Sequence, residues 1–529
     1  MRMPKNIREL IETQTEKYPN KVYLYFEDRE ITYAEFNANI NRAANAFLDL
    51  GIKKGDRVCF FMPNCPEFHY GWLGLAKIGG VMVPINTNYR TEETKYIVNH
   101  SEAKAILVHA SLKQVIDSIR PETPLLKNFL LAGGGAIDGG YQPFEKALAA
   151  ASSDLVSIDI SEDDLLEILY TSGTTGPSKG AMMSHRYWYM TGAGFVYSLQ
   201  IETEDRLFTC LPLFHANAQG YSTMGSLIAG ASLILMDKFS ATKFWDQIRH
   251  YRATEFNFIG AMLTILSKQP ETDRDREHRV RLAYGTPGLS KPFEEYMVKR
   301  FGIKFYSGYG LTECGLGTMT PVKGIWKEKT MGLPRQIPIP GFVNEIKIVN
   351  DQGEDVPPGT VGEIAMRNPG MMSGYFKEPE LTAKVIKGGW LYTGDQGWMD
   401  RDGYFFFADR KKDVIRRRGE NVSSIEVETV INAHPKVLES AVIGVASEFQ
   451  DDELKAYVVA RPNETIDPLE IVRWCKERLA YFKVPRFIEF RSELPKTPTL
   501  RVQKYKLREE KKDPGQDCFD LAKTGFNLR

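Results

Sequence analysis

The hydrophobic residues near the start of the chain follow a helical period and then a strand period. Thr32 and Glu35 have the spacing of a capping box, in which each side chain satisfies a free backbone amide at a helix start. Apolar residues then recur at helical spacing at Ile40, Ala43, Ala44, Phe47 and Leu48, and Gly51 is a plausible end. Apolar runs predict strands at 57–62, 81–84 and 105–109, with a helix at 67–78 between the first two. This alternation predicts an α/β fold with covered, mostly parallel sheets.

The pattern changes twice further along the chain. Residues 340–410 contain short period-two stretches between Asp/Gly turns, which predict a β-subdomain. Beyond 410 the pattern is that of a small α+β unit: a helix capped by Ser423 and Glu426, strands at 441–445, 454–460 and 487–490, and a helix at 471–479. We therefore predict an N-terminal domain of residues 1–409 and a C-terminal domain of residues 410–529. Residues 132–155 are expected to form a surface connection, and the charged run 271–279 a solvated loop or helix end.

Composition excludes several classes of protein. Hydrophobic residues make up 43% of the 529 residues and charged residues 26%, as in ordinary globular proteins. Basic and acidic residues balance at 68 each, so charge gives no reason to expect nucleic acid or an anionic membrane as the partner. No apolar run has the length of a secretory signal or a spanning helix. The six cysteines are scattered without a Cys-x-x-Cys pair, which favours reduced thiols in the cytoplasm.

The strongest chemical signal is the segment Tyr170-Thr-Ser-Gly-Thr-Thr-Gly-Pro-Ser-Lys-Gly180, which follows an apolar run at 165–169. Its glycines allow close approach of backbone amides to an anion, four hydroxyls add neutral donors, and Lys179 adds one positive charge. It is not a Walker loop, because Gly180 follows the lysine. A flexible Ser/Thr/Gly linker is the alternative, although a linker needs neither the preceding strand nor the lysine. We predict a phosphate-binding loop.

Three weaker clusters are compatible with nucleotide chemistry. Tyr306-Ser-Gly-Tyr-Gly-Leu-Thr-Glu-Cys314 offers Tyr309 to stack on a base, Thr312 to donate to a phosphate and Glu313 to hold Mg²⁺. A turn after a buried strand is an equal interpretation of this segment. Asp395 and Arg410 could hold ribose hydroxyls, or form an ordinary surface ion pair. His215 lies among apolar residues, where a histidine is more often part of the core than a catalyst. No Ser/His/Asp set or metal-ligand spacing is present, so hydrolase and zinc functions gain no support.

Together these motifs resemble the adenylate-forming superfamily of acyl-CoA synthetases, luciferases and peptide-synthetase adenylation domains, from about residue 8 to 507. The resemblance implies an N-terminal domain of two α/β subdomains plus a β-subdomain, and a small α+β C-terminal domain that rotates between two half-reactions. It implies catalytic roles for Lys179, His215, Thr312, Glu313 and Arg501, with Mg²⁺ held by Glu313 and Thr175. The implied ATP/AMP site comprises Thr171, Ser172, Gly173, Thr174, Thr175, Gly176, Lys179, Gly285, Thr286, Pro287, Ser307, Gly308, Tyr309, Gly310, Thr312, Asp395 and Arg410.

The same resemblance implies a hinge at Lys412 and an acyl pocket, with His215 between that pocket and the ATP site. The implied coenzyme A residues are Arg417, Arg418, Gly419 and Glu420. The implied acyl pocket residues are His215, Ala216, Gln219, Ile259 and Gly260. The implied cofactors are ATP, Mg²⁺ and coenzyme A, and the protein is expected to be a monomer or homodimer with no membrane segment.

One motif departs from the family pattern. The family usually ends with Pro-Lys-Thr-x-x-Gly-Lys, whereas this chain has Leu500 and Arg501 at the last two positions. Arginine keeps the charge but is a broad planar fork, and leucine does not readily adopt a positive φ. We therefore expect weakened adenylation but intact thioester formation from a supplied acyl-adenylate. Lys504 or Lys506 could substitute for the missing lysine.

Among family functions the sequence favours an acid:CoA ligase. The segment 416–426 looks most like the corresponding segment of the carnitine/crotonobetaine CoA ligase branch. No carrier domain follows residue 507, which makes a peptide-synthetase module less favoured. The alternatives are a luciferase-like oxygenase and a non-catalytic adenylate-binding homologue. The mixed polar and apolar lining of the acyl pocket does not identify the acid.

Overall fold

The structure is a computed structural model, and the chain divides into two compact units. Unit 1 comprises Met1–Thr87, Ile97–Tyr170 and Gly180–Asp409, and unit 2 comprises Asn88–Tyr96, Thr171–Lys179 and Arg410–Arg529. The residues that the structure describes are 3–134, 139–171, 178–286, 289, 291–325, 327–328, 330–410, 414–447, 451–495, 502, 504–510, 515, 517–526 and 528.

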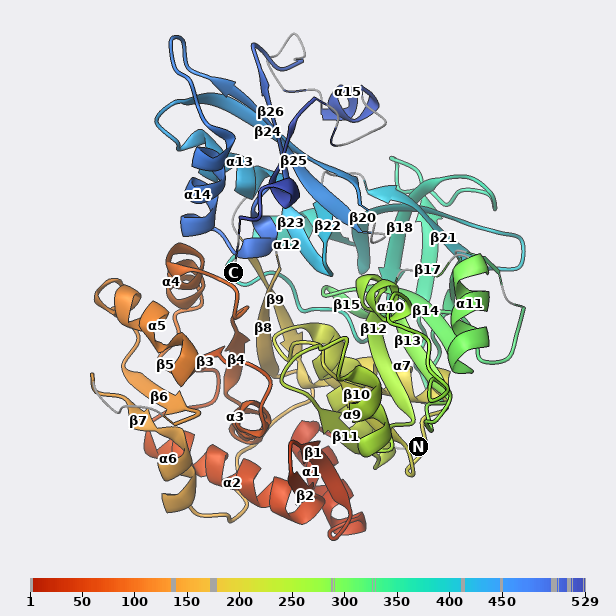
Figure 1. Cartoon of the computed structure of the whole chain (residues 1–529). Coiled ribbons are helices and arrows are strands. Elements are labelled where there is room, and N and C mark those ends of the chain that lie inside the picture. The colour runs from red at the N-terminus through yellow and green to blue at the C-terminus, as the bar shows by residue number, and fades with distance from the viewer. Residues whose placement is uncertain are drawn as a thin grey trace. The chain divides into compact units, whose positions relative to one another are not determined.

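The first sheet carries the strands on either side of the predicted phosphate loop (Figure 1). Its order is β7 (Gln142–Pro143), β6 (Asn128–Ala132), β5 (Ala105–His109), β3 (Arg57–Phe61), β4 (Val81–Pro84), β8 (Leu165–Thr171) and β9 (Lys179–Ser184). Neighbouring strands from β7 to β8 are parallel. The predicted strands at 57–62, 81–84 and 105–109 are therefore confirmed.

The second sheet joins the α/β part of unit 1 to the predicted β-subdomain. Its order is β17 (Glu345–Val349), β18 (Gly362–Arg367), β20 (Trp390–Met399), β21 (Phe405–Arg410), β16 (Thr330–Pro334), β15 (Cys314–Met319), β14 (Lys304–Leu311), β13 (Leu282–Thr286), β12 (Glu255–Ile259), β10 (Arg206–Thr209), β11 (Ser232–Leu235), β1 (Val22–Phe26) and β2 (Arg29–Thr32), with β19 (Ile386–Lys387) beside β20. Pairing is parallel from β14 to β1, and it is antiparallel from β14 to β21 and from β20 to β17. The short strands of 340–410 are thus real but continue a larger sheet.

The helices between residues 7 and 385 contain buried apolar residues, except for the last of them. They are α1 (Ile7–Lys17), α2 (Tyr33–Asp49), α3 (Pro66–Ile78), α4 (Thr91–His100), α5 (Lys113–Ile119), α6 (Phe144–Ala150), α7 (His185–Leu199), α8 (Gly225–Ala229), α9 (Phe244–His250), α10 (Gly260–Ser267), α11 (Lys291–Phe301) and α12 (Pro379–Val385), with 3₁₀ turns η1 (Ala110–Leu112) and η2 (Arg120–Glu122) and the π-helix η3 (Asn217–Met224). The capping box of Thr32 and Glu35 at the start of α2 is confirmed.

The surface connection expected at 132–155 is wrong for its second half. Residues 144–150 form α6, in which Phe144 and Leu148 are buried. Their spacing of four places them on one helix face, and the Phe144 ring lies 6.1 Å from that of Phe47 on α2. Glycines nearby concealed this short amphipathic pattern. The charged run 271–279 is irregular, as expected. Its Asp275 is nevertheless buried, with Oδ2 2.6 Å from Arg300 Nε.

Residues 410–529, which make up most of unit 2, contain both helices and strands, as the sequence predicts. Their elements are the hairpin β22 (Val414–Arg417) and β23 (Glu420–Ser423), the sheet β24 (Val437–Ala446), β25 (Asp452–Ala460), β26 (Phe487–Arg491) and β27 (Phe519–Asp520), helices α13 (Ser424–Asn432), α14 (Pro468–Arg478) and α15 (Lys504–Glu509), and turns η4 (Tyr481–Lys483) and η5 (Leu521–Lys523). The predicted strands and helix of this region are confirmed within a few residues of their bounds.

Buried cations in unit 2 are paired with carboxylates. Lys483 is 1% exposed, and its Nζ lies 2.8 Å from Glu93 Oε1 and 2.7 Å from Glu426 Oε1. Burial lowers the pKa of Lys483, but Tyr89, Glu93 and Glu426 outweigh it and raise that pKa well above its ordinary value. Lys455 forms a second buried ion pair, in which its Nζ lies 2.9 Å from Glu489 Oε2. These charges are compensated inside the unit.

Candidate active site

The phosphate loop itself lies mostly outside the described residues. Ser172, Gly173, Thr174, Thr175 and Gly176 are not described, whereas Thr171 ends β8 and Lys179 begins β9. The flanking residues Tyr170 and Gly180 are described, and both belong to unit 1. A Cβ at Gly180 would lie 2.6 Å from Ile168 Cγ2, so only glycine allows β9 to lie this close to β8.

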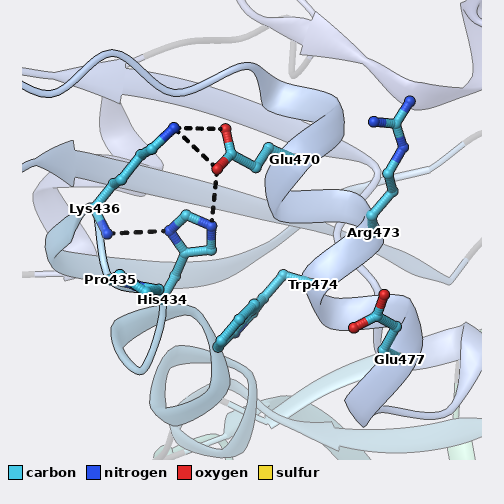
Figure 2. A pocket seen from close by; sticks show the side chains of 7 residues that line it. All are labelled: His434, Pro435, Lys436, Glu470, Arg473, Trp474 and Glu477. Atoms are coloured by element: carbon cyan, nitrogen blue, oxygen red, sulfur yellow. Dashed lines mark hydrogen bonds and ion pairs between the residues drawn. The ribbon is translucent and has the colours of Figure 1, made fainter.

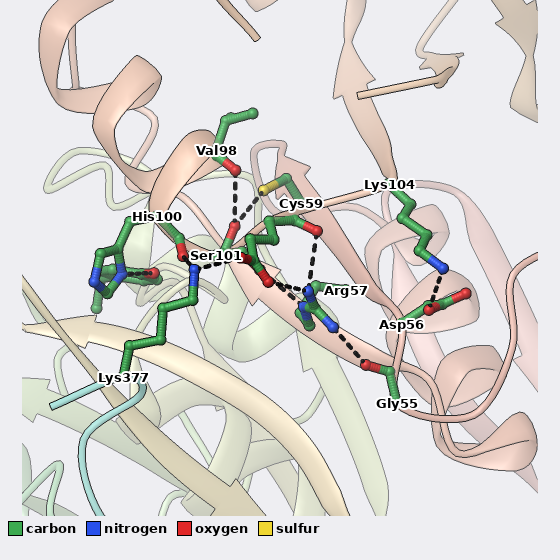
Figure 3. Close-up of polar contacts among 11 residues, drawn as sticks. Gly55, Asp56, Arg57, Cys59, Val98, His100, Ser101, Lys104 and Lys377 are labelled. Carbon is green, nitrogen blue, oxygen red and sulfur yellow. Dashed lines mark hydrogen bonds and ion pairs between the residues drawn. The ribbon is translucent and has the colours of Figure 1, made fainter. Parts of the chain in front are cut away.

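Tyr170, the residue before the loop, is held by a neighbour from α4. Its hydroxyl lies 2.7 Å from Nδ1 of His100, and the two rings meet edge to face. Lys377 approaches the same corner, where its Nζ donates to the His100 carbonyl at 3.2 Å and pairs with Glu102 at 2.7 Å (Figure 3). The end of β8 is therefore fixed by polar contacts on both sides of His100.

Several residues of the predicted ATP/AMP site lie on the neighbouring strands β13 and β14. Gly285 and Ser307 are register partners in these parallel strands, and Thr286 follows at the end of β13. A Cβ at Gly308 would lie 2.5 Å from the Thr318 carbonyl oxygen, which leaves room only for glycine. The neighbouring Gly310 lies in the same strand, and Pro287 is outside the described residues.

Two residues given separate roles by the sequence are in direct contact. The Tyr309 hydroxyl donates to Asp395 Oδ2 at 2.8 Å, although 86 positions separate them. Asp395 lies on β20 and is 8% exposed. The backbone places the base-stacking and ribose-binding candidates side by side. The side chain of Arg410, at the end of β21, is not among those described.

Glu313 follows β14 and is held by a residue that the sequence did not single out. The Tyr375 hydroxyl donates to Glu313 Oε1 at 2.7 Å. Within the described part of the chain, Glu313 Oε2 makes no hydrogen bond or ion pair. The preceding residue, Thr312, accepts through its carbonyl from the Tyr187 hydroxyl at 2.9 Å. An oxygen ligand with one orienting hydrogen bond fits Mg²⁺, which needs only one or two protein carboxylates.

The acyl pocket candidates lie at the start of a π-helix and at the end of β12. Gln219 belongs to η3, which follows His215 and Ala216, and π-helical turns often mark functional sites. Ile259 ends β12 and Gly260 begins α10. His215 is half-buried and its ring lies 4.8 Å from that of Phe214. These residues are all within unit 1.

A buried carboxyl group on β8 lies beside Gln219 and was missed by the sequence analysis. Glu167 is fully buried, and neither of its oxygens makes a hydrogen bond with the described residues. Burial raises the pKa of Glu167 well above its ordinary value. The nearby Gln219 amide lowers that pKa by a smaller amount, although the two side chains do not have the geometry of a hydrogen bond. The sequence signal that could have identified Glu167 is its position as the one carboxyl residue in the apolar run 165–169.

The coenzyme A candidates form a tight hairpin in unit 2. Arg418 and Gly419 both have positive φ, 53° and 79°, in the two-residue turn between β22 and β23. Arg417 points into the unit, with its guanidinium 2.7 Å from Glu453 and hydrogen bonds to the carbonyls of Phe482 and Val484. Arg417 therefore stabilises the fold, and Arg418 is the exposed cation of the turn. Lys412, Leu500 and Arg501 lie outside the described residues.

A separate pocket of about 330 Å³ lies in unit 2 (Figure 2). His434 Nε2 and Lys436 Nζ lie 3.4 and 3.1 Å from Glu470 Oε1, so these three polar groups are already paired. None of its residues belongs to the predicted site: His434, Pro435, Lys436, Glu470, Arg473, Trp474 and Glu477. Across the described ranges, no cluster of three His, Cys, Asp or Glu residues could hold a metal, and no helix is long and apolar enough to cross a membrane.

Comparison with known proteins identifies the class. The profile of the AMP-binding enzyme family matches residues 11–376, and that of the AMP-binding enzyme C-terminal domain matches residues 426–500. The chain belongs to this family, the adenylate-forming superfamily of acyl-CoA synthetases. It is 36% identical over 515 residues to crotonobetaine/carnitine–CoA ligase of Salmonella typhimurium (strain LT2), covering 95% of this chain and 99% of the relative.

Solved structures agree with the fold. The anthranilate CoA ligase AuaEII, in complex with anthranoyl-AMP, has a TM-score of 0.74 and 28% identity over 96% of this chain and 98% of its own. An o-succinylbenzoate CoA synthetase double mutant from Bacillus subtilis, bound to a product analogue, has a TM-score of 0.81 and 25% identity over 96% and 99%. The protein is thus an adenylate-forming CoA ligase, as the sequence predicted, and no comparison favours a non-catalytic homologue.

Proposed function

We propose that the chain uses ATP and Mg²⁺ to activate a small carboxylic acid and then transfers the acyl group to coenzyme A. In the first half-reaction the substrate carboxylate attacks the α-phosphorus of ATP, and pyrophosphate leaves. In the second, the coenzyme A thiolate attacks the acyl carbon, and AMP leaves with the electron pair of the broken C–O bond. The observation that carries this proposal is the contact of Tyr309 with Asp395, because Tyr309 lies on β14, the strand that immediately precedes Glu313.

The roles of individual residues belong to this proposal. Residues 171–176 and Lys179 bind the phosphates, Thr312 contacts the α-phosphate, and Asp395 with Arg410 holds the ribose beside Tyr309. Glu313 and Thr175 hold Mg²⁺, which neutralises negative charge on the phosphates. His215 lies between the acyl pocket and ATP. Catalysis is then mainly positioning and electrostatic stabilisation.

Residues 410–529 are proposed to rotate between the half-reactions, carrying Arg501 to one and the Arg418–Glu420 turn to the other. The departure at Leu500 and Arg501 weakens the first half-reaction alone. Leu500→Gly with Arg501→Lys is therefore expected to increase pyrophosphate release and leave thioester formation from supplied acyl-adenylate unchanged. No gain in pyrophosphate release would contradict this assignment.

The acid is identified by assaying AMP release with and without coenzyme A across a panel. The panel contains crotonobetaine and carnitine, because both appear in the name of the Salmonella relative, together with fatty and aromatic acids. Acid-dependent AMP release that requires coenzyme A for turnover supports the proposal. AMP release with no acid preference, or none with any acid, argues against it.

A further inference from the structure

Tyr375 is built into the site in a way that the adenylation chemistry alone does not explain. The side chain is 7% exposed, and its hydroxyl donates to Glu313 Oε1 at 2.7 Å. The Tyr375 hydroxyl therefore orients the Glu313 carboxylate through this hydrogen bond.

The backbone around Tyr375 is tied to the strand that leaves the phosphate loop. Phe376 N donates to the Gly180 carbonyl at 2.8 Å, Met182 N donates to the Gly374 carbonyl at 2.9 Å, and Tyr375 pairs with Ala181 in an isolated bridge. We call residues 371–376 the bridging segment. Its hydrogen bonds extend β9 by a short antiparallel partner.

The other end of the bridging segment is tied to the backbone of Glu313. Met372 N donates to the Glu313 carbonyl at 2.9 Å, and Met371 bridges to Cys314. The segment thus contacts Glu313 through both its main chain and its side chain. It links the β14–β15 turn to the strand following the phosphate loop.

The conformation of the segment is also set from outside the site. Tyr375 N donates to Thr382 Oγ1 at 2.8 Å, and that hydroxyl donates to the Glu378 carbonyl at 2.9 Å. Gly374 has a φ of 132°, which side-chain-bearing residues rarely adopt. Because α12 supplies Thr382, the position of the Tyr375 ring is determined before any nucleotide binds.

We propose that Tyr375 is a positioning residue for the metal–nucleotide step: it fixes the Glu313 carboxylate so that Oε2 is presented to Mg²⁺–ATP. This inference rests on the proposed role of Glu313. Partners that orient a metal-binding carboxylate typically contribute 10- to 100-fold to metal affinity or activity. A tyrosine that merely satisfies its hydroxyl in the core has no such effect.

The test compares Tyr375→Phe with Tyr141→Phe. Tyr141 is a matched control, because it is 5% exposed and its hydroxyl donates to the Asp117 carboxylate at 2.8 Å. For Tyr375→Phe, the Mg²⁺ concentration giving half-maximal pyrophosphate release is expected to rise about 10- to 100-fold. Thioester formation from supplied acyl-adenylate is expected to stay within about twofold, and Tyr141→Phe to change neither quantity.

Calorimetric binding of Mn²⁺–ATP gives a second measurement that needs no acid substrate. Tyr375→Phe is expected to weaken this binding, and to add nothing when Glu313→Gln is already present. Equal losses in both half-reactions with an unchanged Mg²⁺ requirement would overturn the positioning role. If the wild-type protein activates no acid, the proposed function fails, and Mn²⁺–ATP calorimetry still decides the role of Tyr375.

Discussion

Buried ionisable groups are treated differently in two regions of the molecule. In unit 2, Lys483, Lys455 and Arg417 are buried against carboxylates at 2.7–2.9 Å. Beside η3 in unit 1, Glu167 and Gln219 are equally buried, yet neither side chain makes a hydrogen bond with the described residues. Paired charges can hold a small unit together, whereas an unpaired buried carboxyl costs stability and marks a candidate functional position.

The largest effect should come from breaking the Lys483 cluster. Lys483→Met leaves the Glu93 and Glu426 carboxylates close together without their cation, and the expected loss is about 3–5 kcal/mol. Urea unfolding measures the loss, and hydrogen exchange in η4 and α13 locates it. Adding Glu93→Gln and Glu426→Gln should restore much of the stability. A loss of stability below about 1 kcal/mol would mean that these paired charges do not hold unit 2 together.

Glu167 should make stability depend on pH in a predictable direction. Since its pKa is raised in the folded state, the folded protein keeps a proton that the unfolded chain releases, and wild-type stability falls as pH rises. Glu167→Gln lacks this penalty. Its stability relative to wild type should therefore increase by about 1.4 kcal/mol per pH unit between the ordinary and raised pKa values.

Denaturation at pH 5, 6.5 and 8 measures this difference. Glu255→Gln is the matched control for burial, because Glu255 is also fully buried with both oxygens unpartnered and its pKa raised by burial. Both variants should show the same pH trend. A flat difference for Glu167→Gln would mean that its carboxyl is not neutral in the folded protein.

Acid preference should separate Glu167 from Glu255. If the Glu167–Gln219 pair contacts the acyl group, Glu167→Gln and Gln219→Leu change the ratio of kcat/KM for polar and alkyl acids by about tenfold or more. Glu255→Gln should leave that ratio unchanged. Equal ratios in all three variants would assign the pair to the core.

The smallest effect is expected at the rim of the pocket in Figure 2. Lys436 and Glu470 are each more than a third exposed, so their ion pair is well screened by solvent. Lys436→Ala should change stability by less than about 1 kcal/mol in thermal or urea unfolding. A loss comparable to that of Lys483→Met would contradict the view that burial decides the value of these pairs.

Local signals predicted much of the fold and part of the site. The capping box of Thr32 and Glu35, and the strands of the first sheet, depend on neighbours only a few residues away. The helix α6 was missed because its apolar face has only Phe144 and Leu148 within a glycine- and alanine-rich stretch. Contacts such as Tyr375 with Glu313, 62 positions apart, have no local signal at all.

The sequence by itself determined that the chain is an α/β nucleotide enzyme of the adenylate-forming class, because the composition and order of the motifs can be recognised without knowing the fold. Only the tertiary structure decided that Tyr309 contacts Asp395, that Tyr375 holds Glu313, and that Arg417 serves the fold while Arg418 stays exposed. The physical reason is that pairing and burial depend on which strands become neighbours. Strand order is a property of the whole sheet, and no single motif encodes it.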